Sequence, residues 1–405
     1  PMRYFFISIA SLFHFINLSA YAREFSVNQI YASLDTIDAY IKNKNFKEAL
    51  KIANATISEA QAVNMARILD MSYVYDKKAD CEKELNFRTE LEKTLREIVK
   101  IREINLPKND LMVAFSYSRL ALLLGNKKDY EEAIFYEKKA AFIFKQLKEN
   151  EFHSGSILNL ARLYDKWSNS GNNKYALTNV NLDNERAKRL RLSIDYFTTA
   201  LNLVERPTYN YSAIHNSIAS RFIKLKEYES AIKHHLIELK LDTEDKRRLR
   251  GLTFNTLSDL YDKIGDTKKA IHYAQMGFNY SARNSKSGKE LSQAHEDFAY
   301  FLISAIPNIH AKSKILDQYL YHMERAHLLN KESIRIAENL SQMYENHGEF
   351  KKSIEVMSET LKNLIDDSFS SAHLNLRLGK TLLLIGDRDL GENKNKLLIV
   401  FLFLM

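Results

Sequence analysis

The chain has 405 residues, of which 45% are apolar and 27% charged, as in an ordinary soluble folded protein. With only 4 prolines and 11 glycines it has few turn formers for sheets, so we expect an all-α fold. The single cysteine, Cys81, excludes an intramolecular disulfide and a thiolate metal cluster, and a net charge of +8 is mild for this length. Nucleic-acid binding requires a concentrated basic stripe. So mild a net charge does not amount to one, and we therefore expect no nucleic-acid partner.

Residues 1–22 have the pattern of a secretory signal peptide. Arg3 precedes an almost wholly apolar run at 4–18, and residues 20–22 (Ala-Tyr-Ala) form a small-x-small sequence that a signal peptidase accepts. The apolar run is shorter than the roughly 20 residues that cross a bilayer as a helix. We therefore expect export across the cytoplasmic membrane, to the periplasm or beyond the cell.

One spacing recurs along the rest of the chain. A large apolar residue is followed directly by a small one, and an aromatic or large residue lies three positions further on, as in Leu120-Ala121…Leu124. A second small residue often lies 12 positions after the first, as at Ala133, Ala231, Ala270 and Ser353. Small side chains let two helix backbones approach closely, which predicts antiparallel helix pairs that bury their apolar stripes by stacking on one another.

About nine such pairs are expected. Glycines that suit a left-handed turn should end the first helix of three pairs, at Gly265, Gly348 and Gly386. Counting from Ser72 places Glu84, which is not small, at the second small position of its pair. The expected anchors of the second helices are Ala49, Glu84, Ala133, Ser193, Ala231, Ala270, Tyr319, Ser353 and Gly391.

This pattern resembles the tetratricopeptide repeat family, although the usual Trp and terminal Pro are missing. The best matches combine the triplet with an aromatic and a second small residue, as in Leu340-Ser341…Tyr344…Phe350…Ser353. The resemblance covers 23–393 and implies a right-handed superhelical solenoid of antiparallel helix pairs. It also implies a non-enzymatic scaffold that binds a protein or peptide segment in a concave groove lined by the first helices.

Two insertions and an unusual end depart from the repeat. Residues 168–185 are polar and Asn-rich, and we expect a loop there between the paired helices of one repeat. A second insertion, 306–313, contains a proline. Residues 394–405 finish with nine consecutive apolar side chains. This tail is the start of a membrane helix in a longer protein, a short helix packed on the last repeat, or a misassigned end of the reading frame.

The sequence contains no convincing catalytic motif. The segment 379–381 (Gly-Lys-Thr) lacks the upstream glycine of a phosphate-binding loop, and His295-Glu296 lacks the second His of a zinc-protease motif. Two pairs of histidines have the wrong helical spacing to share a face, His234 with His235 and His322 with His327. We expect scattered surface histidines, and no enzyme activity, cofactor or metal.

Polar residues that flank the packing triplet on the first helices are the candidates for the groove. An Asn amide both donates and accepts hydrogen bonds, which suits an extended peptide backbone. The candidates are Ser118, Arg119, Asn159, Arg162, Asn216, Asn255, Asp259, Asn339 and Gln342, and the alternative is that they are ordinary polar helix residues.

The apolar tail supports a second functional hypothesis. In it, the repeats are the extracytoplasmic sensor portion of a membrane-bound signalling protein, a sensor kinase or regulator, whose membrane helix and output domain follow. Membrane association would then occur through residues 394–405. The oligomeric state is left open by the sequence.

Overall fold

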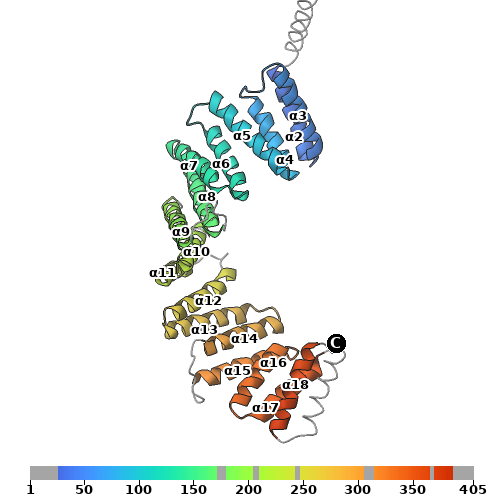
Figure 1. Cartoon of the computed structure of the whole chain (residues 1–405), viewed down its shortest axis with the longest axis vertical. Helices are drawn as coiled ribbons and strands as arrows, with labels where there is room; N and C mark the ends of the chain where they lie inside the picture. Colours follow the sequence, from blue (N-terminus) through green and yellow to red (C-terminus); the bar gives the residue numbers. More distant parts are fainter. Residues whose placement is uncertain are drawn as a thin grey trace, which may run out of the picture. The chain divides into compact units, whose positions relative to one another are not determined.

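The computed structural model describes residues 26–170, 179–203, 209–241, 247–304, 314–364 and 369–385, and every regular element in these ranges is an α-helix (Figure 1). The expectation of an all-α chain is confirmed. No helix within them is both long enough and apolar enough to cross a membrane. The helices are α2 (Val27–Lys42), α3 (Phe46–Ala62), α4 (Met71–Glu84), α5 (Arg88–Asn105), α6 (Leu111–Asn126), α7 (Tyr130–Gln146), α8 (Asn150–Asn169), α9 (Asn179–Leu201), α10 (Tyr209–Lys224), α11 (Tyr228–Lys240), α12 (Arg247–Lys263), α13 (Thr267–Asn284), α14 (Gly288–Ser304), α15 (Lys314–Leu329), α16 (Ile334–Asn346), α17 (Phe350–Asn363) and α18 (Phe369–Leu384).

The helices form two compact units, which divide between residues 206 and 207. In unit 1, α2 pairs with α3, α4 with α5, α6 with α7 and α8 with α9, and each hairpin packs on the next. Unit 2 repeats this arrangement from α10 to α17, and α18 packs on α16 and α17. We call the first helix of each hairpin, and α18, an A helix, and the second a B helix. The predicted stack of antiparallel pairs is confirmed, and Gly391, the anchor expected to follow α18, lies outside the described residues.

The predicted close contacts between paired helices are present. Ala121 of α6 and Ala133 of α7 have no exposed surface, and the same holds for Ala219 and Ala231 in unit 2. At three of the small positions that are serines, the hydroxyl donates directly to a carbonyl oxygen of the paired helix. The contacts are Ser193 Oγ to Ala161 O at 2.7 Å, Ser258 Oγ to Ala270 O at 2.9 Å and Ser341 Oγ to Ser353 O at 3.3 Å.

The turn between paired helices has one recurring backbone geometry. The N–H of Asp129 donates to the carbonyl of Leu124 at 2.9 Å, and the residue between the helices, Lys128, has a left-handed φ of 68°. This is the Schellman arrangement that ends a helix and satisfies its last carbonyls. Gly265 and Gly348 adopt it as predicted, whereas Gly386 lies outside the described residues. The same turn is also made without glycine, at Lys44, Asn86, Lys128 and Lys226.

The turn geometry corrects the register of the hairpin α4/α5. The N–H of Phe87 bonds the carbonyl of Glu82, as Asp129 bonds Leu124, so Ala79 takes the place of Ala121. The prediction that Glu84 anchors a second helix is wrong, because it is the exposed last residue of α4. The error has a physical cause: Ser72 is also buried, about two helical turns before Ala79 on the same stripe, and therefore imitates the small position.

The segments that depart from the repeat are only partly described. Helix α9 begins at Asn179, so it includes the end of the stretch 168–185 that we expected to be a loop, and α8 continues to Asn169. The insertion 306–313, the leader 1–22 and the tail 394–405 lie outside the described residues.

Candidate functional site

In unit 1 the A helices carry charged side chains that link neighbouring hairpins. The guanidinium of Arg119 on α6 donates to Asp76 Oδ1 and Asp80 Oδ1 on α4, at 2.7 Å each. The buried Arg102 of α5 donates to the other oxygen of Asp76. Burial raises the pKa of Asp76, and the two guanidinium groups counteract that rise. Arg119, a predicted groove residue, is therefore engaged in holding α6 against α4.

Two further predicted residues surround a buried carboxylate. Glu137 of α7 is 1% exposed, and it accepts hydrogen bonds from Ser118 Oγ at 3.0 Å and from Asn159 Nδ2 at 3.2 Å. Burial raises the pKa of Glu137, while these donors favour the ionised form. Arg162 is exposed beside Asn159, with Nη1 3.5 Å from Oδ1. Ser118 and Asn159 thus tie α6 and α8 to α7, and Arg162 is left facing solvent.

The same device appears in unit 2. Asn216 of α10 donates from Nδ2 to Glu238 Oε2 of α11 at 3.3 Å, and His235 Nδ1 lies 3.0 Å from the same oxygen. Glu238 is buried, so the amide compensates for part of its lost hydration. Asn216 therefore has a structural partner, as Ser118 and Asn159 do.

The predicted residues Asn339 and Gln342 connect three successive A helices. Asn339 of α16 donates from Nδ2 to the Tyr300 hydroxyl of α14. Gln342 of α16 accepts from Arg377 Nη2 of α18 at 2.7 Å, and its own amide donates to Asn346 at 3.0 Å. These exposed links bind hairpin to hairpin along the A helices, so both residues have partners within the stack.

The remaining two predicted residues line a hollow. Asn255 and Asp259 of α12 face a pocket of about 250 Å³ that is closed by α13 and α14. Gly277 on α13 permits this arrangement, because a Cβ there would collide with Asn255 Oδ1. Burial raises the pKa of Asp259, and the charge of Lys263 opposes that rise. The structure thus brings two of the nine predicted residues into one concave site.

The opposite wall of this pocket comes from α14 and was missed by the sequence reasoning. It carries the carboxylate of Asp297, which accepts from Gln293 Nε2 at 2.7 Å, and the rings of Phe298 and Phe301. Asp297 lies two positions before the small residue Ala299, as Arg119 lies two before Ala121. The spacing that selected Arg119 would therefore have found Asp297.

The histidines correct another expectation. His295 and His322 are buried, and their Nδ1 atoms lie 2.9 Å apart across the hairpin α14/α15. His215 and His234 make the same contact, also at 2.9 Å, across α10/α11. The prediction of scattered surface histidines is wrong for these residues. Their pairing joins two helices, whereas the sequence test considered spacing along one helix only.

These histidine pairs replace aromatic pairs of other hairpins. One member lies four positions before the first small residue, where α6 has Tyr117 and α12 has Phe254. In those hairpins Tyr117 packs against Tyr136, with ring centroids 5.7 Å apart, and Phe254 against Tyr273 at 6.5 Å. The histidine pairs are therefore polar substitutes inside the hairpin core.

The described residues hold no group of three or more His, Cys, Asp or Glu side chains arranged to bind a metal ion. Cys81 is buried in α4, and burial raises the pKa of its thiol to about 11. The thiol therefore stays protonated at neutral pH and is a poor nucleophile.

No protein-family model and no curated protein matches the sequence. Among solved structures, the C-terminal part of a TPR repeat-containing protein from Cytophaga hutchinsonii superposes with a TM-score of 0.50, at 17% identity, over 76% of this chain and 99% of that chain. The fold is of the tetratricopeptide type. The apo form of RapI (TM-score 0.45, 14% identity, 92% of this chain and 96% of that chain) and BtubC from P. vanneervenii (0.39, 17%, 64% and 92%) are also similar to this tetratricopeptide fold.

Proposed function

We propose that this chain is a non-enzymatic scaffold that binds a segment of a protein or peptide on the A-helix face of unit 2. The observation that carries the proposal is the pocket between α12 and α14. An amide and two carboxylates, from Asn255, Asp259 and Asp297, surround apolar walls formed by Phe298 and Phe301. Such a site fits a side chain with an apolar stem and a hydrogen-bond donor or positive charge at its tip.

The links between A helices support this use of the face. The contacts from Asn339 to Tyr300 and from Arg377 to Gln342 hold neighbouring helices in place before any partner arrives. A preformed surface loses little conformational entropy on binding, so more of the contact energy appears as affinity. The structural roles of these side chains are therefore compatible with a binding face.

Photo-crosslinking tests the proposal directly. A benzophenone amino acid replaces Asn255 on the A-helix face, and in a matched control it replaces the exposed Tyr321 on the B helix α15 of the same unit. We expect a discrete adduct with a protein from the native host only at position 255. Adducts of equal yield at both positions, or none at 255, would exclude this face.

Substitution then tests the carboxylates. The double variant Asp259→Asn with Asp297→Asn keeps the shape of the pocket and removes its charge. We expect this variant to bind the captured partner with about tenfold lower affinity, while its far-ultraviolet circular dichroism is unchanged. Equal affinity for the variant and the native chain would remove the pocket from the binding site.

We also propose that the chain is exported, on the basis of the leader pattern at 1–22. Fractionation of the host and the intact mass of the mature chain test this, and a cytoplasmic chain that retains residues 1–22 would refute it. The apolar tail at 397–405 supports the sensor hypothesis as the alternative. DNA beyond the codon for Met405 that encodes about ten more apolar residues, a positive cluster and a soluble domain would favour the sensor.

A further inference from the structure

Two hollows lie on the B-helix side of unit 1, one on each side of α5. The first, about 600 Å³, lies between α3 and α5 above α4, and the second, about 620 Å³, lies between α5 and α7 above α6. The buried Tyr75 and Tyr117 line the two hollows at equivalent positions, since each lies four residues before the small residue of its helix. The hollows are therefore successive copies of one groove with different linings.

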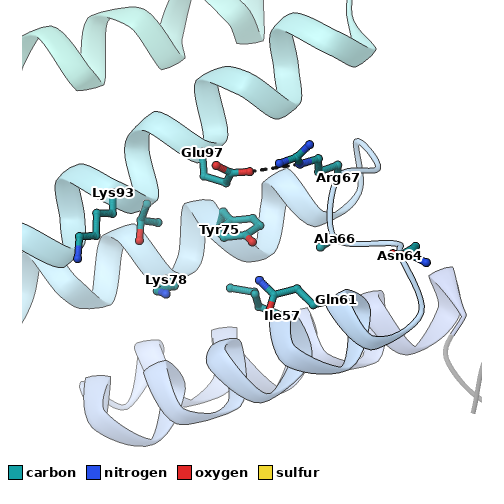
Figure 2. Close-up of a pocket in the computed structure, with 10 residues that line it drawn as sticks. Ile57, Gln61, Asn64, Ala66, Arg67, Tyr75, Lys78, Lys93 and Glu97 are labelled. Atoms are coloured by element: carbon teal, nitrogen blue, oxygen red, sulfur yellow. Dashed lines mark ion pairs between the residues drawn. The ribbon is translucent and has the colours of Figure 1, made fainter.

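The first hollow is polar and basic. Lys78 and Lys93 lie at one end, and Arg67 lies at the other, where its Nε is 3.8 Å from Glu97 Oε1 (Figure 2). The Gln61 amide projects from α3 into the space between these ends (Figure 2). Lys78 Nζ also lies 3.8 Å from Oε1 of the buried Glu82, so three basic side chains stand against two acidic ones. The remaining positive balance makes this hollow attractive to a carboxylate.

The second hollow is aromatic, and its lining also has more basic than acidic side chains. Phe135 and Phe142 lie on one face of α7 and are 54% and 57% exposed. Lys139 Nζ is 4.9 Å from the Phe135 ring centroid and 3.4 Å from Glu103 Oε1. Lys108 and Lys138 complete a lining of three basic residues and one acidic residue.

The two exposed phenylalanines are not needed for the fold. Alignment of the hairpin turns places Lys93 and Lys100 of α5 at the positions of Phe135 and Phe142, and both lysines are exposed. The same scaffold therefore accepts a charged side chain at each place. Exposed rings gathered beside a hollow are typical of a surface that a partner covers.

We propose that the B-helix side of unit 1 docks an acidic segment of a partner protein. An apolar side chain of that segment packs against Phe135 and Phe142 in the second hollow, and its carboxylates reach Lys93 in the first. The positive balance of both hollows selects the acidic partner, and the rings supply the contact area. This surface is separate from the pocket in unit 2 and does not depend on it.

Peptide selection on the immobilised full chain tests the surface. A random peptide library is selected against the native chain and counter-selected against the double variant Phe135→Lys with Phe142→Lys. This variant copies the residues of α5, so we expect it to fold. Enriched peptides should combine an aromatic or aliphatic residue with flanking Asp or Glu. The proposal would be overturned if the enriched peptides were basic, or if no peptide were enriched on the native chain relative to the double variant.

Affinities of one enriched peptide complete the test. We expect a loss of about tenfold or more in the double phenylalanine variant, and a smaller loss with a weaker salt dependence in Lys93→Glu. The control Leu252→Ser removes an exposed apolar side chain from unit 2 and should have no effect, as should Asp259→Asn with Asp297→Asn. Equal affinity in all variants, or tighter binding to phosphatidylglycerol vesicles than to the peptide, would refute a protein-docking surface here.

Discussion

Replacement of the buried pair His295 and His322 by Phe and Tyr should remove an acid sensitivity from unit 2. The new pair copies Phe254 and Tyr273, which occupy the equivalent positions in the hairpin α12/α13. In the native chain, burial lowers the pKa of His322 to about 4, and the charge of His295 acts in the same direction. The pKa of His295 is also lowered, first by burial and then by the charge of Arg325.

The size of the effect follows from proton linkage. An unfolded histidine titrates near pH 6.5, about 2.5 units above the pKa of folded His322, so the unfolded state binds more protons at mildly acidic pH. With respect to His322, the folded state therefore has its full stability above about pH 6.5 and loses stability as the pH falls toward about 4. Between pH 7 and pH 5, His322 alone should cost the folded state about 2 kcal/mol. The neighbouring rings of Phe278 and Phe298 carry no charge that would offset this loss.

Hydrogen exchange of the full chain, read by mass spectrometry at pH 7 and pH 5 and corrected for intrinsic exchange rates, measures this locally. Peptides from α14 and α15 should lose protection in the native chain at pH 5, by about 2 kcal/mol of opening free energy, and keep it in the double variant. Peptides from α6 and α7, which carry the Tyr117 and Tyr136 pair, serve as the internal control. An equal loss in the native chain and the variant would refute the role of the imidazoles.

Three further substitutions test the hairpin packing by urea and thermal unfolding of the full chain at pH 7. Ala231→Leu overfills the contact with Ala219 and should cost roughly 1–3 kcal/mol, and an unchanged melting temperature would contradict the register. Lys128→Gly relieves a left-handed φ of 68° and should stabilise by up to about 1 kcal/mol; destabilisation would show that the lysine side chain is needed. Glu82→Leu removes a buried carboxylate whose pKa is raised by burial and should stabilise by about 1 kcal/mol; a lower melting temperature would refute this and show that the contacts with Thr94 and Lys78 outweigh the cost of burial.

Contacts within one hairpin were the most predictable part of the chain. The spacing from Ala121 to Ala133, and from Ala219 to Ala231, is fixed by the length of a helix, a short turn and a second helix, so it is visible in the sequence. It gave the wrong anchor in the hairpin α4/α5, where a second buried small residue, Ser72, repeats the pattern on the same stripe.

Contacts between hairpins were less predictable. Asn159 and Arg119 were placed on the correct helices, but their partners, Glu137 and Asp76, lie on other helices and are chosen by three-dimensional packing. The histidine pairs escaped notice for the same reason, although the positions of His215 and His295, each four residues before a small residue, were a usable signal. The chemistry of a side chain does not by itself predict which neighbouring residue will become its hydrogen-bond or ion-pair partner.

The serine contacts between paired helices have a consequence for how such chains diverge. Because Ser258 and Ser341 satisfy their hydroxyls on a carbonyl of the adjoining helix, a polar atom can enter the tightest part of a hairpin without an unsatisfied group. Alanine and serine are then nearly interchangeable at the very sites that define the repeat. Successive copies can drift until no residue is shared by all of them, while the backbone they specify remains the same.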